Sequence, residues 1–176
     1  MCAALLCAVG TATAESGERP VIGRSEKVWI KDADTILTAR IDTGTRTSSL
    51  HAEALSYFRK EGKNWVRFTF RDDTGSAYTL TRPIKRFGNF KNNGVGDDVR
   101  PVVTLGLCIG TIYRRTQVNL VNRGDFNYSL LIGRRYLSNL LLVDTGKRLT
   151  HQPACRNTAG VLKNRGVPCV HSGKGS

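Results

Sequence analysis

The strongest constraint on the fold is a pair of short segments that alternate apolar and polar residues. Residues 64–70 (NWVRFTF) and 76–82 (SAYTLTR) place apolar side chains at alternate positions, which is the period of a strand with one buried face. The connecting residues 71–75 (RDDTG) contain the aspartate and glycine that tight turns favour. We therefore expect an antiparallel hairpin, in which the Asp-Thr-Gly sequence at residues 73–75 forms the turn.

Similar patterns predict four further strands. Residues 21–30 and 35–42 are two of them, and residues 100–109 and 112–121 form a second hairpin about a turn at Gly110-Thr111. The strand at 35–42 ends at Asp42. The side chains expected to share one face are Leu37, Ala39 and Ile41 in that strand, and Ile112, Val118 and Leu120 in the last one.

The rest of the folded region adds a loop, a strand and very little helix. Residues 87–98 (FGNFKNNGVGDD) are rich in glycine and asparagine and predict a mobile loop. Residues 130–133 (LLIG) predict a buried strand that ends at a glycine, residues 134–139 a helix of a turn and a half, and residues 140–144 a last strand. So little helix among so many strands indicates an all-β fold, either a small barrel or a folded sheet.

The 176-residue chain is long enough for one domain with tails. Residues 1–14 (MCAALLCAVGTATA) are uncharged and end in a small-x-small pattern, so we expect a cleaved signal peptide and a periplasmic or secreted mature protein. An apolar tail that stays attached is the alternative. We expect the folded domain in residues 15–150 and a basic, mostly disordered tail in residues 151–176. No segment approaches the apolar length that a membrane span needs.

The formal net charge of +13 is spread over the chain in single and paired Lys and Arg residues, a pattern typical of a solvated basic surface. Such a charge favours an anionic partner, such as an acidic polypeptide or a polyanionic envelope surface. Nucleic-acid binding is not expected. Export separates the chain from nucleic acid, and its aromatic residues, 7% of the total, show no periodic stacking pattern.

The cysteines and histidines bear on redox chemistry and metal binding. Cys2 and Cys7 fall in the expected signal, and Cys108 lies in an apolar segment. Cys155 and Cys169 lie in the polar tail, and we expect them to form a disulfide in an oxidising compartment. The sequence lacks C-x-x-C and H-E-x-x-H patterns, and its three histidines are scattered. We therefore predict neither a metal site nor a cofactor.

The order of three features resembles retropepsin-type aspartic proteases: an apolar strand that ends in Asp-Thr-Gly, a central hairpin, and an apolar-apolar-Gly-Arg segment that opens a short helix. The resemblance is closer to the bacterial family labelled ATP-dependent zinc protease, which is regarded as retropepsin-like. The segments that carry it are RIDTGTRTSSLHA (40–52), RPVV (100–103), LLIGRRYL (130–137) and LLVD (141–144). The resemblance implies a single-lobe acid-protease barrel with one short helix.

The same resemblance, which covers residues 21–144, implies an exported aspartic endopeptidase. One lobe supplies one aspartate, whereas hydrolysis by an activated water needs two carboxylates that share a proton. The family chemistry therefore implies a homodimer in which each protomer contributes Asp42. Thr43 would link the two loops, and Gly44 would let the backbone approach a peptide substrate. The residues that would brace the catalytic loop are Ile132, Gly133 and Arg134.

The resemblance leaves open the roles of three side chains, Arg46, Arg134 and His51, and the position of the flap. Viral members carry an aspartate at the place of Arg46, where it pairs with the helix arginine, so Arg134 needs another partner. Either the two arginines jointly bind an acidic substrate group, or both are solvated. His51 resembles a family position and is a candidate substrate contact, with a structural hydrogen bond as the alternative. The flap that excludes water is either residues 71–75 or residues 87–98.

A third Asp-Thr-Gly, at residues 144–146, also follows an apolar strand. A second catalytic lobe would need its own hairpin, flap and brace, and only 32 residues follow Asp144. We therefore expect Asp144 to end the last strand, with a turn after it.

Three functions stay open from the sequence alone. They are an aspartic peptidase, a non-catalytic retropepsin-like module that binds a peptide or an envelope component, and a zinc-dependent hydrolase. The sequence gives ATP dependence no support, because it lacks the G-x-x-x-x-G-K-[ST] loop that binds nucleotide phosphates.

Overall fold

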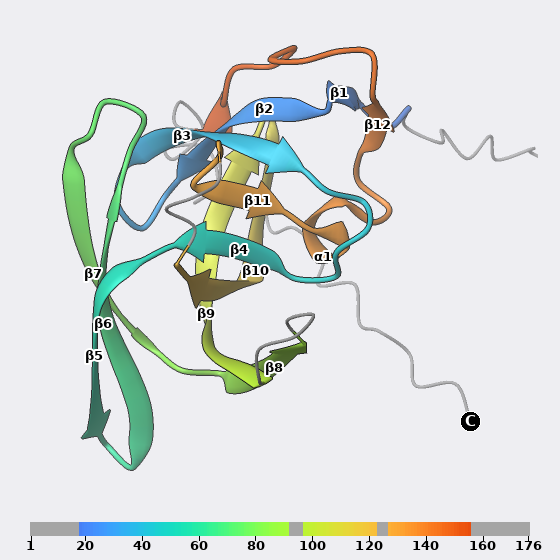
Figure 1. Cartoon of the computed structure of the whole chain (residues 1–176). Coiled ribbons are helices and arrows are strands. Elements are labelled where there is room, and N and C mark those ends of the chain that lie inside the picture. The colour runs from blue at the N-terminus through green and yellow to red at the C-terminus, as the bar shows by residue number, and fades with distance from the viewer. Residues whose placement is uncertain (1–17, 92–96, 123–126, 156–176) are drawn as a thin grey trace, which may run out of the picture.

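The centre of the computed structural model, which describes residues 18–91, 97–122 and 127–155, is a closed barrel of six strands (Figure 1). The barrel strands are β2 (Ser25–Ile30), β3 (Thr35–Ile41), β4 (Ser48–His51), β9 (Asp97–Ile109), β10 (Ile112–Val121) and β11 (Leu130–Ile132). Their order is β10-β4-β11-β3-β2-β9, and pairing between β9 and β10 closes the ring. The single-lobe all-β barrel expected from the sequence is confirmed.

Smaller elements surround the barrel. A three-stranded sheet lies beside the barrel (Figure 1). Strand β8 pairs with β9 and so extends the barrel sheet. A two-stranded parallel sheet joins the two ends of the domain. These elements are β5 (Glu53–Lys60), β6 (Lys63–Arg71), β7 (Ala77–Pro83), β8 (Arg86–Lys91), β1 (Val21–Gly23), β12 (Leu142–Asp144) and α1 (Arg134–Leu137). Within the described ranges, no helix has the length and apolar character that crossing a membrane requires.

The barrel interior is built from the alternating apolar faces that the sequence predicts. In β3, Leu37 and Ala39 are fully buried and Ile41 is almost so. In β10, Val118 and Leu120 are buried on the facing wall. Full burial of one such aliphatic side chain stabilises a fold by roughly 1.5–3 kcal/mol, so these faces hold the sheet closed on itself.

Strand β11 lies between β3 and β4, which are consecutive in the chain but do not pair with each other. It runs parallel to β3, with Ile132 opposite Ile41, and antiparallel to β4. The chain must therefore cross the end of β11 to pass from β3 to β4. This crossing brings residues 42–47 against the residues that follow β11, and it sets Asp42 at the rim of the barrel.

Several predicted elements differ in detail. The predicted strand at 21–30 is divided into β1 and β2 at Arg24. Residues 87–98 were predicted as a loop, but residues 87–91 belong to β8 and residues 97–98 to the start of β9. Main-chain hydrogen bonds between β8 and β9 hold both segments in strand conformation. Residues 92–96 lie outside the described ranges. The sequence analysis missed β4 and β5, and β5 is exposed along almost its whole length, so it shows no alternation.

The disulfide prediction was wrong. Cys155 is bonded to Cys108, at the end of β9, across a sequence separation of 47 residues. Both cysteines pack with Trp29 in a small buried cluster, and the N–H of Ala154 donates to the carbonyl oxygen of Gly110 (2.8 Å). The folded region thus extends past residue 150 to Cys155. Residues 1–14 and Cys169 lie outside the described ranges.

Candidate active site

Asp42 directly follows β3 and continues its pairing with β11, because its N–H donates to the carbonyl oxygen of Ile132 (2.9 Å). The side chain turns back over its own loop. Its Oδ1 atom accepts hydrogen bonds from the N–H groups of Gly44 (2.8 Å) and Thr45 (3.2 Å). The carboxylate is therefore fixed in orientation while it remains partly exposed at the rim of the barrel.

Opposing effects act on the pKa of Asp42. Burial raises the pKa, but the hydrogen bonds from Thr45 and Gly44 and the positive charge of Arg40 outweigh it, so the pKa lies below the usual value. In an isolated chain the Asp42 carboxyl group is therefore ionised at neutral pH, and the ionised form is the one that can accept a proton from water.

The loop that carries Asp42 is held from the other side by the start of α1. The Nη1 atom of Arg134 donates to the carbonyl oxygens of Thr43 and Gly44, both at 3.1 Å. The backbone N–H of Arg134 donates to Thr45, and that of Arg135 to Arg46. These bonds supply the partner for Arg134 that the sequence left unidentified. Arg134 therefore uses this guanidinium nitrogen to hold the loop, and these contacts do not support the alternative in which Arg134 and Arg46 jointly bind a substrate group.

Gly133 lies where α1 meets this loop, and its N–H donates to the Ser48 hydroxyl (3.1 Å). A methyl group at Gly133 would lie 2.9–3.0 Å from backbone atoms of Thr47 and Arg46. Backbone atoms cannot move aside as a flexible side chain can, so only glycine fits there without displacing the loop.

Gly133→Ala is therefore expected to destabilise the fold by about 1–3 kcal/mol, the usual cost of overpacking, and to displace the Asp42 loop. Thermal unfolding and peptide cleavage would measure the two effects. Gly146→Ala is the matched control, because its added methyl group would approach only the movable Asp144 carboxylate, at 3.3 Å. Equal stability and activity for the two variants would contradict the proposed bracing role of Gly133.

Two buried polar residues behind the loop were missed from the sequence. Asn119 in β10 is 2% exposed, and its side-chain amide donates to the carbonyl oxygen of Ser48 (3.0 Å). Ser48 is fully buried and in turn accepts the Gly133 N–H. The sequence feature that could have indicated this contact is the asparagine inside the otherwise apolar segment 118–121 (VNLV), because a buried side-chain amide requires a hydrogen-bond partner.

The structure does not bring His51 to the site. Strand β4 begins with Ser48 beside the loop and ends at His51, roughly 10 Å away by the rise of an extended strand. His51 Nε2 lies 3.1 Å from Glu53 Oε1, and its backbone N–H donates to Ser129. These contacts agree with the alternative of a structural hydrogen bond.

The other two Asp-Thr-Gly segments are turns, as predicted. Asp73 accepts hydrogen bonds from the N–H and hydroxyl of Thr38 and pairs with Lys27 (3.0 Å). Asp144 ends β12, accepts the N–H of Gly146 (2.9 Å) and pairs with Lys147 (3.3 Å). Each carboxylate is occupied by its own turn or by a neighbouring strand.

Of the two flap candidates, the turn at residues 71–75 is tied to β3 through Asp73, which opposes the movement that a flap needs. Residues 87–98 belong instead to the hairpin of β8 and β9, whose connecting residues are not described. The choice of flap stays a prediction.

No group of three or more His, Cys, Asp or Glu side chains suited to a metal ion occurs within the described part of the chain.

A closed single lobe with an Asp-Thr-Gly loop, braced by an apolar-Gly-Arg segment that passes between two consecutive strands, defines a retropepsin-like domain. Residues 21–154 match the RimB-like family, described as retropepsin-like aspartic endopeptidase RimB, and the chain belongs to this family.

Relatives include a probable alpha-L-glutamate ligase of Shewanella pealeana, 32% identical over 111 residues that cover 61% of this chain and 24% of the ligase. A protein of the same name from Desulfotalea psychrophila is 28% identical over the same length. The chain thus spans about a quarter of the length of these curated relatives. The crystal structure of a protein of unknown function from Legionella pneumophila is similar with a TM-score of 0.66 and 32% identity, and the match covers 77% of this chain and 100% of that one.

Proposed function

We propose that this protein is an exported aspartic endopeptidase in which two protomers each contribute Asp42 to one catalytic site. The observation that carries the proposal is the geometry of the Asp42 loop. Its carboxylate is oriented by two backbone N–H groups at the rim of the barrel, and the loop is pinned from behind by Arg134. Such a rigid, accessible carboxylate suits proton transfer.

The reaction requires two carboxylates in different protonation states. The ionised Asp42 takes a proton from water as the water attacks the peptide carbonyl, while the protonated Asp42 of the second protomer donates to the carbonyl oxygen. Two such groups a few ångströms apart cannot both ionise, so the pair shares one proton and has two apparent pKa values that belong to the dyad. Thr43 and Gly44 are exposed beside Asp42, where a second protomer could contact them.

The proposed substrate class is an acidic peptide. The relatives named probable alpha-L-glutamate ligase contain a segment similar to this chain, and the substrate in their name, glutamate, is an acidic amino acid. The net charge of +13 favours the approach of such a chain. Export to the periplasm or beyond rests on the apolar, uncharged residues 1–14.

The test is cleavage of glutamate-rich peptides by the purified mature chain over a range of protein concentrations, with sedimentation analysis of the same samples. Activity per chain is expected to rise with the dimer fraction and to be unaffected by a metal chelator, because the dyad forms only between protomers and uses no metal. Loss of cleavage with chelator would indicate a zinc-dependent hydrolase instead. A well-folded dimer that binds peptides without cutting them would indicate a non-catalytic binding module.

A further inference from the structure

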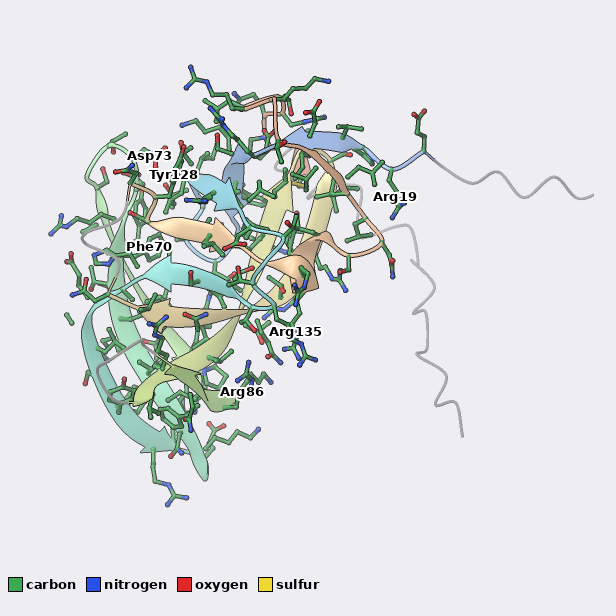
Figure 2. All side chains as sticks on the ribbon, turned by 45° about the vertical axis from the view of Figure 1, so that its right-hand side comes forward. Arg19, Phe70, Asp73, Arg86, Tyr128 and Arg135 are labelled. Carbon is green, nitrogen blue, oxygen red and sulfur yellow. A yellow bond between two sulfur atoms is a disulfide. The ribbon has the colours of Figure 1, made fainter. Side chains whose placement is uncertain are left out.

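Arg134 and Arg135 are consecutive in α1, but their guanidinium groups bind different partners. Arg134 binds carbonyl oxygens of the Asp42 loop, whereas Arg135 Nη1 donates to the side-chain oxygen of Gln117 in β10. The same Gln117 oxygen accepts a hydrogen bond from Arg86 Nε in β8 (3.3 Å). One neutral oxygen thus holds two guanidinium groups side by side, and Figure 2 shows Arg86 and Arg135 on the same side of the molecule.

A third arginine belongs to this group. The N–H of Arg135 donates to the carbonyl oxygen of Arg46 (3.0 Å), which lies in the same loop as Asp42. Burial together with the positive charges of Arg46 and Arg86 lowers the pKa of Arg135, so both neighbouring charges repel that of Arg135. Arg46 and Arg86 are exposed and Arg135 is partly exposed, so their donors are accessible to a ligand.

No carboxylate in the described part of the chain forms an ion pair with any of the three arginines. Elsewhere on this protein, Arg82 pairs with Asp32 at 2.6 Å. A cluster of cations with only a neutral amide oxygen at its centre is electrostatically unfavourable until an anion joins it. Guanidinium groups offer the planar, two-pronged donors that match a carboxylate.

We propose that Arg86 and Arg135, positioned by Gln117, form together with Arg46 a subsite that binds a carboxylate of the peptide substrate next to the Asp42 loop. This inference rests on the proposed peptidase function and assigns residues to its preference for acidic substrates. The three side chains come from the Asp42 loop, from β8 and from α1, so the subsite forms only where these elements meet. Arg46 belongs to the Asp42 loop and the N–H of Arg135 is bonded to it, so a carboxylate held there would lie against that loop.

The carboxylate could belong to a glutamate side chain or to the end of the peptide, and three peptides separate the sources. One carries internal glutamates and an amidated end, the second replaces these glutamates by glutamine and keeps the amide, and the third is the glutamine peptide with a free terminal carboxylate. Binding is measured by calorimetry in the Asp42→Asn background, where cleavage cannot interfere, and kcat/KM is measured with Asp42 present.

Arg135→Gln is expected to weaken binding of a carboxylate-bearing peptide by about tenfold or more, the usual effect of losing a charge-assisted hydrogen bond, and to leave the neutral peptide unaffected. Arg46→Gln and Arg86→Gln should act in the same direction. Arg135→Lys should recover binding only in part, because lysine retains the positive charge but lacks the planar pair of N–H donors of a guanidinium group. The matched control is Arg67→Gln, an exposed arginine of the three-stranded sheet, which should bind all peptides as the parent does.

Two results would overturn the subsite. One is equal binding of acidic and neutral peptides by the parent protein. The other is an equal loss of acidic-peptide binding in Arg135→Gln and Arg67→Gln, because the effect would then come from the overall charge of the protein. These measurements test the subsite and the proposed peptidase function independently. Selective loss of acidic-peptide binding supports the subsite even if no peptide is cleaved, and cleavage without that selectivity supports the peptidase alone.

Discussion

Asp42→Asn is expected to reduce peptide cleavage by about 100-fold or more, the scale of a lost general acid or base. Asparagine has nearly the same shape, and its side-chain oxygen can still accept the N–H groups of Gly44 and Thr45 that orient Asp42. The loop should therefore keep its conformation while the group that takes a proton from water is lost. In a homodimer the substitution removes both members of the dyad at once.

The measurement is kcat/KM on a glutamate-rich peptide, with thermal unfolding as the check on folding. Asp144→Asn is the matched control, because it makes the same change in another Asp-Thr-Gly, one whose carboxylate accepts the N–H of Gly146 and pairs with Lys147. Undiminished cleavage by a folded Asp42→Asn protein would refute the dyad. A comparable loss in Asp144→Asn would mean that the third Asp-Thr-Gly takes part in catalysis.

Loss of the Cys108–Cys155 disulfide is expected to be the largest change in stability. The bond closes a segment of 47 residues, and the chain-entropy relation gives about 4 kcal/mol for a loop of that length. It also fixes residues 150–155 against the barrel, where the N–H of His151 and the N–H and hydroxyl of Thr150 donate hydrogen bonds to the buried carboxylate of Glu26. The double variant Cys108→Ala with Cys155→Ala should therefore unfold at lower denaturant concentration and expose the end of the domain to proteolysis.

Urea unfolding under oxidising conditions, with a parallel series in reducing agent, would measure this effect. The double variant should be insensitive to the reducing agent, and the parent protein should become like the variant when reduced. Cys169→Ala is the control and should behave as the parent does. Destabilisation by Cys169→Ala together with an unchanged Cys108→Ala single variant would restore the Cys155–Cys169 pair and reject the one in the structure.

Local patterns accounted for the elements that the sequence predicted correctly. The hairpin of β6 and β7 follows from alternation on both sides of a turn that contains Asp73 and Gly75, and all of that information lies within about twenty residues. The brace at Gly133 came from a resemblance to a family, whose motif includes a constraint between distant residues. Strand β5 was missed because it is exposed on both faces, so its side chains carry no periodic signal.

By itself, the sequence determined the all-β class, the position of Asp42 at the end of a strand, and the assignment of two Asp-Thr-Gly segments to turns, because each depends on neighbours in the chain. Only the tertiary structure decided the partners across long separations. It joined Cys155 to Cys108, directed Arg134 to the Asp42 loop, and placed Gln117 between Arg86 and Arg135. These contacts form where β11 enters between β3 and β4 and where β9 closes on β10, and chain order alone does not specify which side chains then meet.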